Sequence, residues 1–136
     1  MSLKGIIVNT KEVTLDFPGH PDFKVTVGAI SRELLRKIRK DATRTEMDSK
    51  LRMPIEKLDE NKFSQEFTKA AVKGWSGLTY EVLSQLTLID ESSIPDMGAE
   101  IDYSEEDAEL LLKESQIFDS WVNEVVYDIA RFRTGK

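Results

Sequence analysis

The chain has 136 residues, of which 40% are hydrophobic and 32% charged, and its formal net charge is −6. This composition is typical of a folded protein and predicts a single domain over residues 1–136. The chain has no cysteine, which excludes disulfides and thiolate metal sites, and no apolar run reaches the ~20 residues that cross a bilayer. We therefore expect a soluble cytoplasmic protein with no membrane partner.

The first structured region reads as a β-hairpin over about 11–28. Apolar residues alternate with polar ones in 13–17 and again in 23–27, which indicates two strands with one buried face. Turn-forming residues fill 18–22 between them, so we expect a loop of about five residues. A third strand is a candidate at 5–8.

Beyond the hairpin the pattern is helical, and local capping signals set the boundaries. Ser31, Asp59, Thr79 and Ser104 each precede an amphipathic run and have side chains that can cap a helix. We predict four helices, at 31–42, 59–74, 79–87 and 104–133. The segment 43–58 has weak periodicity and contains Pro54, which predicts a loop. The fold class is therefore α+β and predominantly α-helical, with the hairpin packed on a bundle of about four helices.

The last predicted helix carries the strongest apolar stripe. Its acidic first turn suits the positive end of the helix dipole, and Ser115 lies on the stripe as a candidate break into two helices. An apolar face this wide is either deeply buried or shared with a partner. The candidate partner-binding residues on it are Phe118, Trp121, Val122, Val125, Ile129 and Phe132.

The charge is distributed unevenly. Residues 24–57 hold ten basic and five acidic side chains (+5), whereas residues 90–128 hold thirteen acidic and one basic (−12). Phosphates would be repelled by the acidic half, so we do not expect nucleic acid as the main partner. Three interpretations stay open: the two halves pack together, copies associate through opposite faces, or the charges simply solvate the surface.

The sequence contains no recognisable catalytic apparatus. The single histidine, His20, sits in the predicted hairpin loop, and the acidic run 105–109 lacks the alternating ligands and glycine of a calcium loop. There is no phosphate-binding glycine loop and no nucleophile elbow. We therefore expect no enzyme activity, no metal and no cofactor.

Three phrases together resemble a known family. They are the hairpin strand 23–27 followed by the helix 31–38, the phrase Ala71-Val72-Lys73-Gly74-Trp75-Ser76-Gly77-Leu78-Thr79, and the ending Phe118-Asp119-Ser120-Trp121-Val122. Over residues 11–134 the chain resembles the tail assembly chaperones of siphophages and prophages, in which a segment of the type V-x-x-W-x-G-L precedes an acidic loop and a C-terminal helix.

The resemblance implies a non-catalytic function. Such chaperones are expected to bind the tail tape measure protein, and tail-tube subunits as a second class of partner, during tail morphogenesis. They act in the host bacterial cytoplasm and are absent from the mature virion. Self-association of this chain is a separate expectation. Two alternatives stay open: a structural subunit of a phage tail or head–tail connector, and a small DNA-binding regulator that uses the basic helix 32–40.

Overall fold

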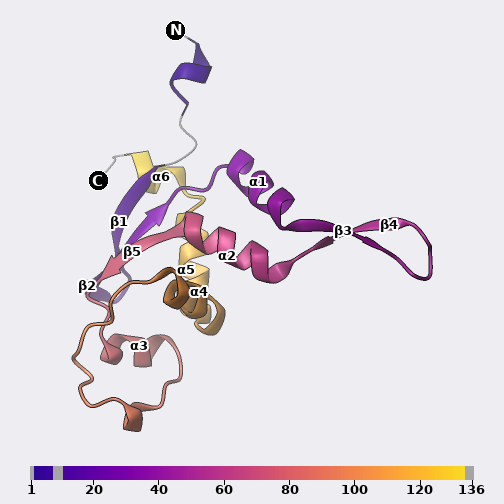
Figure 1. The fold of residues 1–136 in the computed structure, drawn as a ribbon. Coiled ribbons are helices and arrows are strands. Elements are labelled where there is room, and N and C mark those ends of the chain that lie inside the picture. The colour runs from indigo at the N-terminus through magenta and orange to yellow at the C-terminus, as the bar shows by residue number, and fades with distance from the viewer. Residues whose placement is uncertain (1, 8–10, 134–136) are drawn as a thin grey trace.

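A computed structural model describes residues 2–7 and 11–133. Its centre is an antiparallel sheet in the order β1-β2-β5, formed by Glu12–Phe17, His20–Gly28 and Val72–Ser76. Helices pack on one face of this sheet, and a second hairpin projects from the body as an arm (Figure 1). The α+β class predicted from the sequence is confirmed.

The first hairpin forms where the alternation predicts it, but its loop is shorter than expected. Phe17 pairs with His20, so the turn consists of Pro18 and Gly19 alone, and the residues after it already belong to β2. Gly19 has φ 83°, a left-handed conformation that glycine adopts without steric cost. A proline followed by a glycine of positive φ is the residue pattern of a type II turn.

The sheet is buried on one face only. The side chains of Val13, Phe17, Phe23, Val25 and Val27 lie in the core. On the opposite face, Lys24 pairs with Asp16 at 2.6 Å, and the hydroxyls of Thr14 and Thr26 are 2.8 Å apart. This is the alternation expected of a half-buried antiparallel sheet.

The third strand comes from a part of the sequence that we predicted to be helical. The second helix, α2 (Glu60–Ala71), ends at Ala71 rather than at residue 74, and the chain continues as β5 along β2. The prediction of a strand at 5–8 is wrong for Gly5–Ile7, which hold part of a 3-10 turn and no strand, and Val8 lies outside the described residues. Gly77, just after β5, has a positive φ (75°), and a Cβ there would lie 1.8 Å from the Asp22 carbonyl oxygen.

The segment 43–58 is a β-hairpin, so the predicted loop is wrong. Helix α1 (Arg32–Ala42) runs directly into β3 (Thr43–Met47), which pairs with β4 (Pro54–Leu58). The Asp59 amide donates to the Ala42 carbonyl at 2.7 Å, so the two ends of this arm meet at its base. Beyond the base the arm leaves the body (Figure 1).

The helix predicted over 104–133 is three helices. They are α4 (Glu105–Glu114), α5 (Gln116–Val125) and α6 (Ile129–Arg133). The break between α4 and α5 falls at the predicted position: Ser115 has extended backbone, and its hydroxyl accepts from the Phe118 amide at 3.1 Å. The predicted caps at Ser31, Asp59, Thr79 and Ser104 are confirmed, since each side chain accepts from a backbone amide of the following helix.

One cluster of buried side chains joins the sheet to the helices. Its centre is aromatic: Phe17 lies 5.4 Å from Phe23 and 5.0 Å from Trp121 between ring centroids, and Phe118 stacks on both phenylalanines. Helices α2, α4 and α5 cover the apolar face of the sheet, and the arm adds nothing to the cluster. The short helix α3 (Tyr80–Leu86) closes the far end of the core through Leu86.

Candidate binding surface

Most of the C-terminal stripe that was predicted to bind a partner is buried in the protein's own core. Phe118, Trp121, Val122, Val125 and Phe132 are all buried. Only Ile129, 75% exposed, is open to a partner. The sheet supplies the opposing apolar layer that the sequence pattern alone does not reveal.

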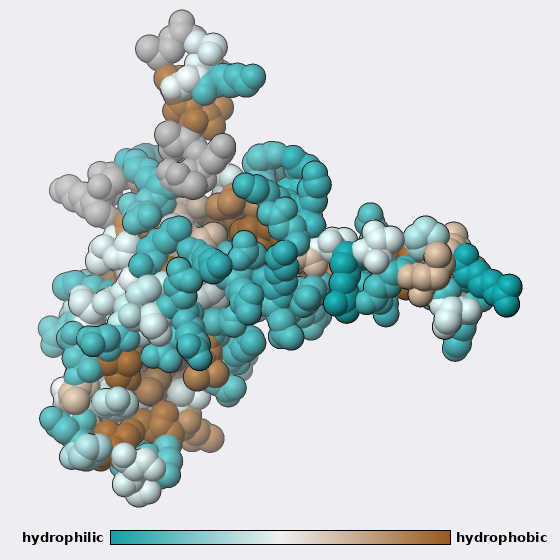
Figure 2. Space-filling view, viewed as in Figure 1, coloured by the Kyte–Doolittle hydropathy of each residue, from teal (hydrophilic) through white to brown (hydrophobic). Residues whose placement is uncertain are grey.

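The described surface has exposed apolar side chains elsewhere, in a groove between α3, the loop after it and α4. The groove has a volume of about 500 Å³. Leu88 is 99% exposed and Leu110 is 55% exposed at its edge, while Leu78 and Leu111 lie buried below. The groove is lined by Trp75, Leu78, Tyr80, Leu83, Thr87, Leu88, Ile89, Ile101, Asp107, Leu110, Leu111 and Glu114. Figure 2 shows apolar side chains gathered around this lower end of the molecule.

The groove floor is fixed by two aromatic side chains. The Trp75 indole N–H donates to the Ile101 carbonyl at 2.9 Å, and the Tyr103 hydroxyl donates to the Val72 carbonyl at 2.8 Å. The two rings meet edge to face with centroids 5.0 Å apart. Burial, and then the charge of Glu105, raise the pKa of Tyr103, so its phenol stays protonated and able to donate at neutral pH.

Residues 97–101 of the long loop beside the groove are tied to the start of α3 by hydrogen bonds. Backbone amides of Tyr80 and Glu81 donate to carbonyls of residues 99 and 97, and the Ile101 amide donates to the Leu78 carbonyl at 2.6 Å. The Gly77 amide donates to the Glu100 carboxylate at 3.1 Å. These bonds give the groove a preformed wall, which lowers the entropic cost of binding a ligand there.

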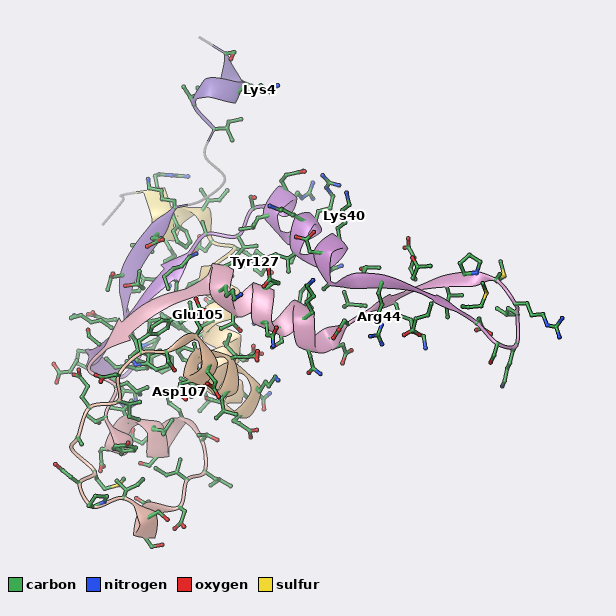
Figure 3. The ribbon with its side chains drawn as sticks, in the orientation of Figure 1. Lys4, Lys40, Arg44, Glu105, Asp107 and Tyr127 are labelled. Carbon is green, nitrogen blue, oxygen red and sulfur yellow. The ribbon has the colours of Figure 1, made fainter. Side chains whose placement is uncertain are left out.

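The groove lies in the most acidic part of the protein. Residues 87–114 contain ten carboxylates and one lysine, a net charge of −9. Hydrogen bonds from Ser92 and then Ser93 hold the pKa of Asp90 below its usual value, so this carboxylate stays ionised. Cations gather elsewhere, as Lys40 on α1 and Arg44 on β3 illustrate, whereas Glu105 and Asp107 project from the start of α4 (Figure 3). Such a surface attracts a positively charged partner.

A second apolar groove surrounds the exposed Ile129. It lies between α1 and α6, where Ile30 and Leu35 form apolar walls. Lys11 and Arg133, the two ends of the described range 11–133, both border it. We take the α3–α4 groove as the candidate surface because it carries Leu88, the most exposed large apolar side chain of the described residues.

The remaining residues considered for chemistry have structural roles. His20 pairs across the hairpin turn with its ring centroid 6.0 Å from that of Phe17. The acidic run 105–109 begins α4, where negative charge stabilises the helix. On the basic helix α1, Arg36 is already paired with Glu33.

Among residues 2–7 and 11–133, no group of three or more acidic or histidine side chains could hold a metal ion. In that same part of the chain, no helix is both long and apolar enough to cross a membrane. Comparison with known proteins gives no family model, curated protein or solved structure that matches this chain. The case for a function therefore depends on the chain's own surface and on the sequence resemblance described above.

Sequence reasoning missed the groove, although one signal for it was present. Leu110, Leu111 and Leu112 are consecutive, and a helix turns by about 100° per residue, so all three cannot share one narrow stripe. Leu111 and Leu112 are buried and Leu110 is left at the surface. Leu88 carried no such signal, because its exposure depends on the path of the loop.

Proposed function

We propose that this chain is a non-catalytic tail assembly chaperone that binds the tape measure protein of a long-tailed phage in the host cytoplasm. Tail-tube subunits are a second class of partner. The observation that supports this proposal most directly is the acidic apolar groove, in which Leu88 is 99% exposed. An apolar groove with a charged rim is the usual geometry for binding an amphipathic helix.

The proposal also draws on the resemblance of residues 11–134 to siphophage tail assembly chaperones. The phrase that carries much of this resemblance, residues 71–79, supplies β5, the groove residue Trp75 and the cap of α3. In this proposal the phrase forms part of the binding surface: Trp75 lines the groove, and Gly77 allows the close approach of the backbone at Asp22. The preferred segment is amphipathic and basic, because the groove region carries a net charge of −9.

Coexpression tests the proposal. The tape measure protein and tail-tube subunit encoded beside this gene are expressed in fragments, with and without this chain. We expect at least one tape measure fragment to stay soluble and to co-purify with it. If every fragment from both tail proteins is equally insoluble with and without the chain, and none co-purifies, the proposal is wrong.

A structural subunit of the tail or head–tail connector is the second candidate, and the arm favours it. A projecting hairpin can contact a neighbouring subunit and so join the subunits of an assembly. Mass spectrometry of purified virions separates the two functions. A structural subunit is present in multiple copies, whereas a chaperone is missing from the finished particle.

A further inference from the structure

We propose that the β3–β4 arm of one copy docks into the acidic α3–α4 groove of a second copy, so that the protein associates head to tail with itself. This inference goes beyond the proposed function, and it implies that the arm and a tape measure segment compete for the same groove. It rests on the arm, on the groove and on the opposite charges of their contact residues.

The arm has apolar side chains that nothing in its own chain covers. Met47 is 69% exposed, Leu51 64% and Met53 52%. All three lie at the distal end, where β3 and β4 join. A two-stranded hairpin is marginally stable alone in water, and methionine adapts its shape to irregular apolar surfaces. The exposed apolar side chains at the arm end are therefore suited to insertion into an apolar groove.

The tip is already ordered for binding. Asp48 accepts hydrogen bonds from the amides of Lys50 and Leu51 at 2.8 and 2.9 Å. Its own amide donates to the Met53 carbonyl at 3.0 Å, and Arg52 takes φ 52° to close the turn. Nearer the body, Glu46 pairs with Arg44 and Lys57 at 2.9 and 3.4 Å. A preformed tip loses little conformational entropy when it docks.

The charges of the tip and the groove are complementary. Lys50 and Arg52 flank Leu51, and no ion pair joins either cation to a carboxylate of the described residues. Asp107 and Glu114 stand beside Leu110 on the groove. Each surface thus offers apolar side chains between charges, and the signs are opposite.

The geometry favours a second copy over the chain's own groove and over nucleic acid. The arm leaves the body where α1 meets α2 and points away from α3 (Figure 1). Residues 43–58 carry four basic and three acidic side chains, a net charge of only +1, which is weak for binding phosphates. A contact between two different surfaces of identical chains leaves one of each free, so association continues into rings or open chains.

The experiment measures weight-average mass by sedimentation and light scattering as the protein concentration rises. For the natural chain we expect the mass to exceed the 15.5 kDa monomer and to increase up to about 1 mM, the range of weak contacts. Added salt should reduce it. A mass that stays at the monomer value throughout overturns the proposal.

The decisive variant replaces Met47–Pro54 by Asn-Gly. Glu46 and Ile55 then close a tight hairpin, while the base of the arm and the Glu46 ion pairs are retained. We expect this variant to fold with unchanged circular dichroism and to remain monomeric. If it self-associates as strongly as the natural chain, the proposal is wrong.

Charge reversal identifies the groove as the acceptor. Lys50→Glu with Arg52→Glu should weaken self-association at least about tenfold, whereas the control Lys37→Glu with Lys40→Glu, with the same change in net charge, should alter it less than about twofold. Asp107→Lys with Glu114→Lys should weaken it as well. Mixing the two reversed proteins should restore mixed complexes; if the mixture stays monomeric, the groove is not where the arm binds.

Discussion

The C-terminal helices and the β3–β4 arm show that the segment richest in apolar residues is not the segment that exposes the most apolar surface. Helices α4 and α5 carry the widest apolar stripe of the sequence, yet Phe118, Val122 and Val125 are completely buried. The arm has weak periodicity, yet its end exposes Met47, Leu51 and Met53. A strong stripe predicts that a face will be covered, and here the sheet of the same chain covers it. Most of the stripe is therefore closed to other molecules, and the arm end, which lies outside it, stays exposed.

The largest effect should come from removing the centre of the core. Phe118→Ala deletes a ring that stacks on Phe17 and Phe23, and we expect it to lower the free energy of unfolding by about 3–5 kcal/mol. On the arm, Met53→Ala should change the free energy of unfolding by less than about 0.5 kcal/mol. Urea denaturation measures both. Comparable losses from the two substitutions would contradict the division between core and arm.

A smaller loss should follow at the floor of the groove. Trp75→Phe removes the indole donor to the Ile101 carbonyl and part of the packing against Tyr103, and should cost about 1–3 kcal/mol. Tyr103→Phe, which removes only the bond to the Val72 carbonyl, should cost about 1 kcal/mol. Amide hydrogen exchange should rise first in residues 97–101. Unchanged exchange there would mean that these bonds do not hold the loop.

At the break between α4 and α5, a single buried hydroxyl caps the start of α5. Ser115→Ala leaves the Phe118 amide without its cap inside the core, and we expect a loss of about 0.5–2 kcal/mol. Ser104→Ala, at the exposed start of α4, removes the equivalent bond and is the matched comparison. Because water can replace the exposed cap, the buried site should lose more in urea denaturation. The reverse order would show that burial does not strengthen this cap.

The fold was predictable where a local pattern was strong, whereas the arm hairpin 43–58, with its weak periodicity, was predicted as a loop. The first hairpin follows from alternation, and four helix starts follow from Ser31, Asp59, Thr79 and Ser104. Strand β5 was missed because its partner β2 lies about 45 residues earlier, so the pairing that stabilises it is invisible in a short window.

The candidate surface was less predictable than the fold. Whether the C-terminal stripe is free depends on the position of the sheet, and the exposure of Leu88 depends on a loop tied to residues 77–81 by hydrogen bonds distant in sequence. Sequence pattern indicates which side chains are apolar. It does not indicate which of them the rest of the chain leaves uncovered.

The smallest effect on stability should come from the groove edge. Leu88→Ser with Leu110→Ser should change the free energy of unfolding by less than about 0.5 kcal/mol, because both side chains already face solvent. Urea denaturation measures this change. A loss above about 2 kcal/mol would mean that these leucines are part of the core.

Capture of the tape measure protein by the same double variant tests the central claim most directly. Coexpressed with the natural chain, a tape measure fragment should be soluble and co-purify. With the variant Leu88→Ser and Leu110→Ser, capture of the fragment should be lost. With the control Ile117→Ser and Ile129→Ser, at exposed positions outside the groove, capture should be retained. Capture that survives the groove variant and fails in the control would contradict the account and return the binding site to the C-terminal helices.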